Sequence, residues 1–406
     1  MVTKTRILIL ADDLTGANDT AIQFCKYGFS TLVDTGIAHT DTAIFKDCDV
    51  VSINTDSRSL SPVNAYQIVY QAVKKYEIAG NGLGVYKKVD SLLRGNPGQE
   101  LAAVMEALEI PLALAAPAFP ANRSLLKHGL LPSGANAVRI FANGSGCKTE
   151  NIPVETIRQG ARSIVAFIHS RNRRGAQVFV ADAIDDNDLK TIYAASICLE
   201  KPHILAGSAG LANQLARKLG KEKEALFTLS PMPTLVVAGS RQAETATQII
   251  TLSQRLSIPI IRFRVSLVME GKSDEAIKEA YNEAAELMRH TVPMCIVAVE
   301  SMFHADKPYI EGNATGKAIS VALGRLTGKL FDDFHFSLLV STGGDTSMEV
   351  CKQLGISCLE PLQEIYPGIP LARIVGSAYN GRLMLTKSGR FGEADTLLKI
   401  LKYAHE

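Results

Sequence analysis

The sequence predicts an α/β protein made of two α/β lobes with mainly parallel sheets facing a cleft. Two observations support this fold class. Short apolar runs alternate with longer amphipathic stretches, which indicates βαβ units and parallel strands. The alternation also occurs twice, before and after a charged, proline-bearing stretch at 218–233 that is typical of a linker. A chain of 406 residues is long enough for two domains, each with a sizeable core.

The first series runs from residue 6 to about 219. Its predicted strands are apolar runs at 6–12, 49–56, 84–90, 111–119, 176–182 and 203–208. Its predicted helices extend to about 28, then over 62–77, from 97 onward, over 186–199 and over 209–219. Asn96 as N-cap, Pro97 at the first helical position and Gln99 at the capping-box position mark one helix start. The segment 117–150 interrupts the pattern, and connections of that length are usually functional or mobile.

The second series repeats the design after the linker. Its predicted strands lie in the stretches 234–240, 259–265, 294–299, 337–346 and 382–392, and a helix at about 392–403 closes the chain. We therefore expect one domain over 1–222 and another over 233–406. Ligands of such sheets bind beyond the carboxyl ends of the strands, so we expect the functional residues there.

Composition excludes several classes of function. The net charge of +2, from 43 basic and 41 acidic residues, gives no reason to expect nucleic acid or a membrane surface as the main partner. No window approaches the roughly 18 apolar residues of a membrane span, and the first apolar run is too short for a signal peptide. The seven cysteines form no CxxC pair and are expected to be reduced core residues. These features predict a cytoplasmic protein.

Polar clusters follow four predicted strands of the first series. Asp12 and Asp13 follow the first strand, and the other clusters are Asp56 with Arg58, Asp90 with Ser91 and Arg94, and Asn122 with Arg123. In a parallel sheet these residues share one rim. Carboxylates accept hydrogen bonds from polyol hydroxyls, and an arginine matches a carboxylate bidentately. The rim therefore favours a small polyhydroxylated acid as ligand, although each arginine taken singly also fits a surface ion pair.

Three glycine-bearing turns follow strands of the second series. They lie in STGGDT at 341–346, in VAGS ending at Ser240, and in KSGRFG at 387–392. Glycines let the backbone approach a phosphate, and a helix N-terminus favours an anion. Asp345 is suited to orient or deprotonate an attacking hydroxyl or to hold Mg²⁺, and helix capping is its alternative role. By contrast, GNATGKA at 312–318 has the wrong spacing for a P-loop, and Ala318 stands where Ser or Thr is needed.

The order of the motifs resembles the four-carbon acid sugar kinase family. The resemblance spans nearly the whole chain and rests on these segments: ADDLTGANDTA, KKVDSLLRGNPGQE, PAFPANR, STGGDTSMEV, PGIPLARIVG and TKSGRFG. It implies ATP-dependent phosphorylation of a four-carbon sugar acid at the hydroxyl far from its carboxylate. It also implies an N-terminal substrate lobe and a C-terminal nucleotide lobe, with ATP and Mg²⁺ as cofactors.

The resemblance also implies site residues. The implied substrate contacts are Asp12, Arg58, Asp90, Ser91, Leu92 and Leu93, with Arg94 close by. The implied nucleotide contacts are Ser240, Thr342, Gly343, Gly344, Asp345 and Gly389. KKVDSLLRGNPG is most similar to the threonate and erythronate branch, which favours D-threonate. Leu92 stands where Thr is expected in many relatives, so D-erythronate and 3-oxo-tetronate stay open as substrates.

The expected mechanism places the sugar acid in the first lobe and ATP with Mg²⁺ in the second, with closure bringing the terminal hydroxyl in line with the γ-phosphate. Asp345 is the first candidate for the base and Asp12 the second, while Asp13 is expected to cap or brace its turn. Two alternatives remain: a non-catalytic sugar-acid sensor, and a magnesium-dependent aldolase or dehydratase with Asp12 and Asp13 as metal ligands. Assembly into a homo-oligomer is also left open.

Overall fold

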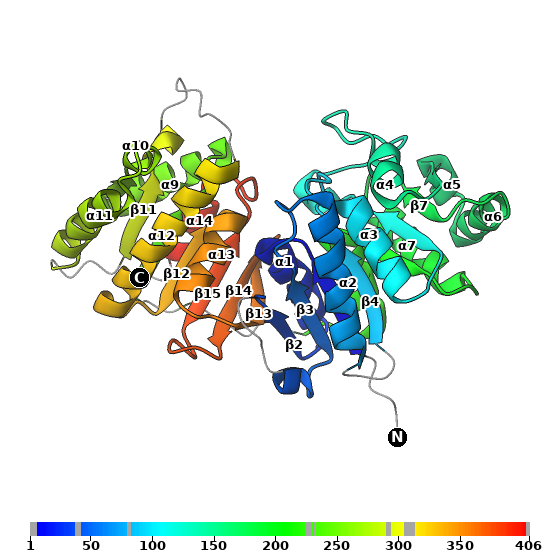
Figure 1. The fold of residues 1–406 in the computed structure, drawn as a ribbon, viewed down its shortest axis with the longest axis horizontal. Coiled ribbons are helices and arrows are strands. Elements are labelled where there is room, and N and C mark those ends of the chain that lie inside the picture. Colours follow the sequence, from blue (N-terminus) through cyan, green and yellow to red (C-terminus); the bar gives the residue numbers. More distant parts are fainter. Residues whose placement is uncertain are drawn as a thin grey trace. The chain divides into compact units, whose positions relative to one another are not determined.

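The structure is a computed structural model that describes residues 6–36, 42–78, 83–223, 229, 232–289, 294–303 and 313–402. Its contacts divide the chain into two compact units, one formed by the described residues up to 223 and one by those from 229 onward. Much of the predicted linker lies outside the described residues. Both units alternate strands and helices, and each contains a mainly parallel sheet (Figure 1). The α/β class predicted from the sequence is therefore confirmed.

The first unit contains a parallel sheet with the strand order β2-β3-β1-β4-β8-β5-β7-β6. Its strands are β1 (Arg6–Ala11), β2 (Thr31–Asp34), β3 (Val50–Asn54), β4 (Leu83–Lys88), β5 (Ala113–Ala116), β6 (Thr149–Ile152), β7 (Val178–Ala181) and β8 (Ile204–Gly207). Strands β3, β5, β7 and β8 are buried along their whole length, because helices cover both faces of the sheet.

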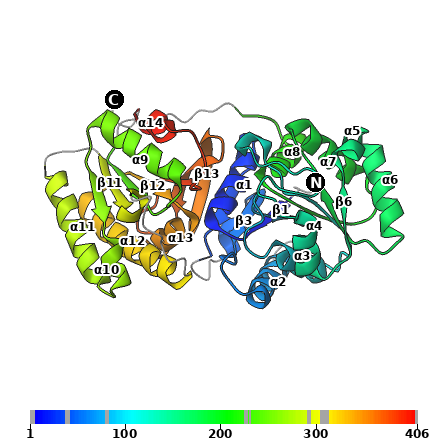
Figure 2. The ribbon, with the colours of Figure 1, turned by 90° about the horizontal axis from the view of Figure 1, so that it is seen from above.

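Helices of the first unit form two layers. They are α1 (Leu14–Lys26), α2 (Pro62–Ile78), α3 (Pro97–Ala107), α4 (Ala137–Ser145), α5 (Val154–Arg158), α6 (Ala161–Asn172), α7 (Asp186–Cys198) and α8 (Ala209–Leu219), with short 3₁₀ turns η1 (Thr42–Phe45) and η2 (Pro120–Asn122). Figure 2 shows α2, α3 and α4 on one face of the sheet and α7 and α8 on the other. Helix α1 packs against α8. The sequence did not predict β2, β6, α4, α5 or α6.

One predicted helix start needs a correction. Pro97 is the first residue of α3, as predicted, but the side chain of Asn96 makes no capping hydrogen bond. Its Nδ2 instead donates to the carbonyls of Ser57 (3.3 Å) and Leu60 (3.0 Å). The capping-box prediction was wrong because the side chain of Asn96 makes a tertiary contact instead of capping the helix. That contact connects the loop after β3 to the start of α3.

The interrupting segment 117–150 is held by a buried carboxylate. Asp182 accepts hydrogen bonds from the backbone N–H groups of His128 (2.6 Å) and Gly129 (2.9 Å) and from Asn151 Nδ2 (3.0 Å). Buried polar groups are usually paired in this way. The segment is thus an ordered part of the first unit that carries α4 and η2.

The second unit contains a mixed sheet with the strand order β10-β11-β9-β12-β15-β14-β13. Its strands are β9 (Thr234–Ala238), β10 (Ile260–Phe263), β11 (Met294–Val299), β12 (Leu338–Thr342), β13 (Cys358–Tyr366), β14 (Ile369–Val375) and β15 (Leu383–Lys387). The first five in spatial order are parallel, whereas β14 pairs antiparallel with both β13 and β15. The sequence predicted neither β13 nor β14.

Helices of the second unit also lie on two faces. They are α9 (Ala243–Leu256), α10 (Val265–Met269), α11 (Ser273–Met288), α12 (Asn313–Phe334), α13 (Gly344–Gln353) and α14 (Thr396–Leu401), with the 3₁₀ turn η3 (Glu300–Phe303). Helices α9 and α14 pack together on one face, and α10 to α13 cover the other (Figure 2). Among the described residues no helix is long and apolar enough to cross a membrane.

Candidate functional sites

Three neighbouring strands bring the acidic motifs of the first unit together. Strands β3, β1 and β4 are adjacent and parallel, with Ala11 at the end of β1 paired in register with Asn54 at the end of β3. Asp12 follows β1, Arg58 follows β3 and Asp90 follows β4. Parallel strands end at the same edge, so sequence segments about 80 residues apart meet there.

Arg58 is the centre of this group. Its Nε donates to Asp12 Oδ2 (2.8 Å) and its Nη2 to Asp12 Oδ1 (3.0 Å), which is the bidentate geometry of a strong arginine–carboxylate pair. Its Nη1 donates to Asp13 Oδ2, and Nη2 also lies 3.4 Å from Asp90 Oδ1. The arginine fork is therefore occupied by carboxylates of the protein itself.

Asp13 has the structural role that the sequence predicted. It is the N-cap of α1, and its Oδ1 accepts the backbone N–H of Gly16 (2.8 Å) while its Oδ2 accepts the hydroxyl of Thr15 (2.7 Å). Capping of this kind satisfies one of the unpaired donors at the start of a helix. Asp13 thereby stabilises the start of α1, immediately after Asp12 in the chain.

The turn after β4 closes on Asp90. Its Oδ2 accepts the backbone N–H groups of Leu92 (3.1 Å) and Arg94 (3.1 Å), and the guanidinium of Arg94 binds it through Nε (3.0 Å) and Nη2 (2.7 Å). Leu93 has a φ of 58° and Gly95 a φ of 82°, so the turn uses left-handed backbone twice. Arg94 is half exposed and Leu93 is buried.

Arg123 lies in a different position from the other arginines. It follows β5, which β8 separates from β4, and its side chain is exposed. The neighbouring Ser124 donates to the carbonyl of Ser91 (2.7 Å), so the turn after β5 reaches the turn after β4. Arg123 belongs to the rim through this contact between turns.

A second, fully buried ion pair supports the site. Lys87 Nζ lies 2.8 Å from Glu100 Oε2, and Ser57 Oγ donates to Glu100 Oε1 (2.7 Å). Burial raises the pKa of Glu100 against the opposing effect of Lys87. This pair could not be predicted from the sequence, because nothing in the spacing of residues 87 and 100 shows that β4 and α3 bring them together.

The charges of the site shift the pKa of its acids downward. Burial alone would raise the pKa of Asp12, but the charge and hydrogen bonds of Arg58, together with the charges of Lys87 and Lys88, hold that pKa below its ordinary value. Burial likewise opposes the hydrogen bond of Arg94 to Asp90, and the pKa of Asp90 is again lowered. Both groups are carboxylates at neutral pH, suited to accept hydrogen bonds rather than protons.

Three adjacent strands of the second unit likewise bring the glycine-bearing turns together. Strands β9, β12 and β15 are neighbours and run parallel. A Cβ placed on Gly389 would lie 2.2 Å from Ser240 Oγ, and one on Gly343 would lie 3.4 Å from Ser240 N. Ser240 thus lies between the other two turns, and Gly389 must lack a side chain for the turns to approach this closely.

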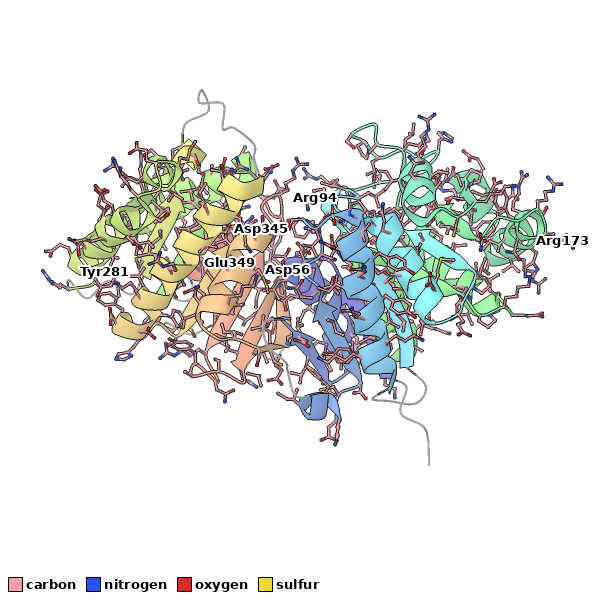
Figure 3. The ribbon with its side chains drawn as sticks, viewed as in Figure 1. Asp56, Arg94, Arg173, Tyr281, Asp345 and Glu349 are labelled. Atoms are coloured by element: carbon pink, nitrogen blue, oxygen red, sulfur yellow. The ribbon has the colours of Figure 1, made fainter. Side chains whose placement is uncertain are left out.

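The start of α13 offers donors at the centre of this arrangement. Gly343, with a φ of 98°, is its N-cap and supplies no side-chain cap. Thr342 Oγ1 is buried without a hydrogen-bond partner in the described structure, which is uncommon for a native hydroxyl. Asp345 is exposed in the first turn of α13, the helix that also carries Glu349 (Figure 3). A phosphate fits this combination of N–H groups and hydroxyl.

Lys387 stabilises the third glycine-bearing turn, at 387–392. Its Nζ donates to the carbonyls of Ser388 (2.9 Å), Gly389 (3.3 Å) and Phe391 (3.0 Å), and its side chain is fully buried. Burial lowers its pKa to about 7. This lysine was not among the residues predicted from the sequence.

The P-loop-like stretch at 312–318 is unrelated to these turns. Its described residues lie in α12, where Lys317 pairs with Glu349 of α13, and Gly312 lies outside the described residues. Lys317 therefore connects α12 to α13, which agrees with the prediction that this stretch is not a P-loop.

Comparison with known proteins identifies the kind of domain that each part of the chain resembles. Residues 7–131 and 125–215 match the model of a sugar-binding N-terminal domain, and residues 235–397 match that of a nucleotide-binding C-terminal domain. The chain belongs to the four-carbon acid sugar kinase family. It is therefore an ATP-dependent carbohydrate-acid kinase, a phosphotransferase.

Its relatives cover nearly its whole length. The kinase is 29% identical to a D-threonate kinase from Salmonella typhimurium over 99% of both chains. It is 26% identical to a D-erythronate kinase from Heliobacterium modesticaldum, over 98% of this chain and 97% of the relative, and 28% identical to a 3-oxo-tetronate kinase from Pseudomonas fluorescens, over 97% and 95%. A solved structure from Salmonella typhimurium shares the fold, with a TM-score of 0.76, 22% identity and coverage of 97% and 98%.

Proposed function

We propose that the kinase converts D-threonate and ATP into 4-phospho-D-threonate and ADP, with D-erythronate or a 3-oxo-tetronate as the alternative substrate. The observation that carries the proposal is the rim of the first unit, where Asp12 and Asp90 stay ionised and are held rigidly by Arg58 and Arg94. The resemblance of the segment 87–98 to the threonate and erythronate branch favours D-threonate. The identities to the three kinds of relative are too similar to decide between substrates.

Asp12 is suited to orient the sugar acid. Each of its oxygens accepts one hydrogen bond from Arg58 and retains capacity for another, which a substrate hydroxyl can use. Its lowered pKa makes it a weak base. We therefore assign to Asp12 the positioning of hydroxyls, and to the turn of Asp90, Ser91 and Leu92 further contacts to the same ligand.

The nucleotide binds, in this proposal, at the three turns of the second unit. Ser240, Gly389 and the turn from Thr342 to Gly344 offer N–H groups, hydroxyls and the start of α13 to the phosphates. ATP enters as its Mg²⁺ complex, and such ions are usually held by substrate phosphates and one or two carboxylates. Asp345 lies in the first turn of α13, next to these phosphate-binding groups.

The proposed chemistry is a single in-line transfer. The O4 hydroxyl oxygen of the sugar acid forms a bond to the γ-phosphorus, the bond from that phosphorus to the bridging oxygen of ADP breaks, and the O4 proton passes to Asp345. Such transfers depend mainly on positioning and on neutralising charge. The protein contributes a rigid acceptor site for the acid and a backbone site for the phosphates.

The rim disfavours a metal-dependent aldolase. Asp12 and Asp13, the metal ligands such an enzyme would use, are both bonded to Arg58, and Asp13 also caps α1. A cation would have to displace the guanidinium from a buried pair. The glycine-bearing turns would also lack a role in such an enzyme.

The proposal is tested by measuring ATP consumption with Mg²⁺ against D- and L-threonate, D- and L-erythronate and 3-oxo-tetronates. Strong turnover on D-threonate, with a product phosphorylated at O4, is the expected result. Preference for another acid of the panel would replace the substrate. Binding of an acid without turnover on any of them would support a sensor and overturn the proposal.

A further inference from the structure

Lys88 is a buried cation that the mechanism above leaves without a role. It is the last residue of β4, two positions before Asp90, and only 4% of its surface is exposed. Within the described part of the chain its ammonium makes no hydrogen bond and no ion pair. Lysines are almost never buried unless paired, because removing an ammonium from water is costly.

Its neighbour Lys87 shows how a structural lysine is satisfied here. Side chains alternate between the faces of a strand, so the two lysines point to opposite sides of the sheet. Lys87 Nζ pairs with Glu100 and also donates to the carbonyls of Leu10 (3.2 Å) and Lys88 (2.6 Å). Lys87 thus has a full set of acceptors, whereas Lys88 has none among the residues that the structure describes.

The ammonium of Lys88 lies against the first turn of α1. A Cβ placed on Gly16 would be 3.0 Å from Lys88 Nζ. Helix α1 has 13 residues, and the partial positive charge of its N-terminus adds to that of the lysine. Both features favour a negatively charged oxygen at this place.

The nearby carboxylates are committed to other groups. Asp12 and Asp90 are bonded to Arg58 and Arg94, and Asp13 accepts Gly16 N–H and Thr15 Oγ1. Lys88 acts on Asp12 and Asp90 only through its electric field, as a minor contribution to their lowered pKa values. The arginine fork of Arg58, which the sequence suggested for the carboxylate of the ligand, is itself occupied.

We propose that Lys88 binds the carboxylate of the sugar acid at the start of α1, an inference that rests on the proposed function. Asp12 and Asp90 then accept hydroxyls of the same molecule, so that the ligand is fixed by a cation at its acid end and by anions along its chain. Lys88 thereby determines that the kinase selects an acid over the corresponding neutral polyol.

The test compares two ligands in the full-length kinase. Binding of D-threonate and of threitol, which lacks the carboxylate, is measured by calorimetry without nucleotide for wild type, Lys88→Met, Lys88→Arg and Lys190→Met. Lys190 is an exposed lysine of α7 and serves as the matched control. The readout is the ratio of the Kd for threitol to the Kd for D-threonate, which does not depend on the fraction of protein that is folded.

Lys88→Met is expected to weaken D-threonate binding about 10- to 100-fold, as for loss of a charged hydrogen bond, and to leave the Kd for threitol within about twofold. Lys88→Arg retains part of the preference for the acid, and Lys190→Met retains all of it. In turnover assays Lys88→Met raises KM for the acid more than it lowers kcat.

Two results would overturn the inference. An unchanged Kd for D-threonate with a lower kcat would place Lys88 on the transferring phosphoryl group. Equal weakening for both ligands would make it a structural residue. If wild type instead acts on another acid of the panel, the proposed substrate fails, and the same ratio is measured with that acid and its polyol. Failure of the substrate assignment and failure of the role of Lys88 are then distinct outcomes.

Discussion

The two candidate sites of the kinase are built from different groups. The site of the first unit consists of buried side-chain charges, with Asp12, Asp13 and Asp90 held around Arg58. The site of the second unit consists of glycine-bearing turns and the uncapped start of α13, with Asp345 as an exposed acid. Directional side chains suit a small ligand with several hydroxyls, whereas backbone N–H groups suit phosphates. We therefore expect substitutions in the first site to act by removing a charge partner. Substitutions of glycine in the second site should act by adding atoms.

The largest effect is expected for Arg58→Met. Breaking a buried ion pair leaves uncompensated charges, so the variant should lose about 3–5 kcal/mol of unfolding free energy and nearly all turnover. Urea unfolding and the ATP-consumption assay measure the two effects. Arg264→Met is the matched control, because Arg264 and Glu279 form an exposed pair, which typically contributes about 1 kcal/mol or less. A similarly small loss for Arg58→Met would show that the network does not stabilise the unit.

Asp345→Asn should have the next largest effect and should act on catalysis alone. Removal of a general base lowers kcat by about 10²- to 10⁴-fold, while the Kd for the sugar acid stays unchanged. Steady-state kinetics at saturating substrates and calorimetry provide the two measurements. Glu275→Gln, which alters an exposed acid in the first turn of α11, should retain full kcat. If Asp345→Asn keeps most of its turnover, the assignment of the base is wrong.

Gly389→Ala should weaken nucleotide binding without affecting the acid. The added methyl group would lie 2.2 Å from Ser240 Oγ, and relief of such overlap typically costs about 1–3 kcal/mol of stability. The accompanying shift of the turn should raise KM for ATP. Gly316→Ala is the control, since no atom lies within 4 Å of its added Cβ. An unchanged KM for ATP would remove this turn from the nucleotide site.

A further effect is a dependence of stability on pH in the second unit. Burial lowers the pKa of Lys387 from 10.5 to about 7, so between these values the unfolded chain binds more protons than the folded one. The stability of wild type relative to Lys387→Met should rise as pH increases from 7 toward 10.5, and the penalty should be complete below pH 7. Denaturant midpoints across this range test the sign. A constant difference up to pH 9 would mean that the carbonyl acceptors keep the lysine charged.

The sequence by itself determined the local structure and the location of most polar motifs. Asp13 caps α1 and Pro97 begins α3 because capping and proline geometry depend on neighbouring residues in the chain. The α/β class could also be predicted, because the alternation of strands and helices is visible as a local pattern along the chain. Strands β13 and β14 escaped prediction, since their antiparallel pairing interrupts the pattern of parallel strands.

Tertiary structure alone decided the partners of the charged groups. The insertion of β8 between β4 and β5 separates the strand before Arg123 from that before Asp90, and the meeting of β3 with β1 directs Arg58 to Asp12 rather than to a ligand. Lys87 and Lys88 are identical neighbours in the sequence, yet Lys87 is paired with Glu100 whereas Lys88 has no partner in the described part of the chain. The energy of a buried charge depends on the groups that surround it in space, and the order of strands in the sheet determines those groups.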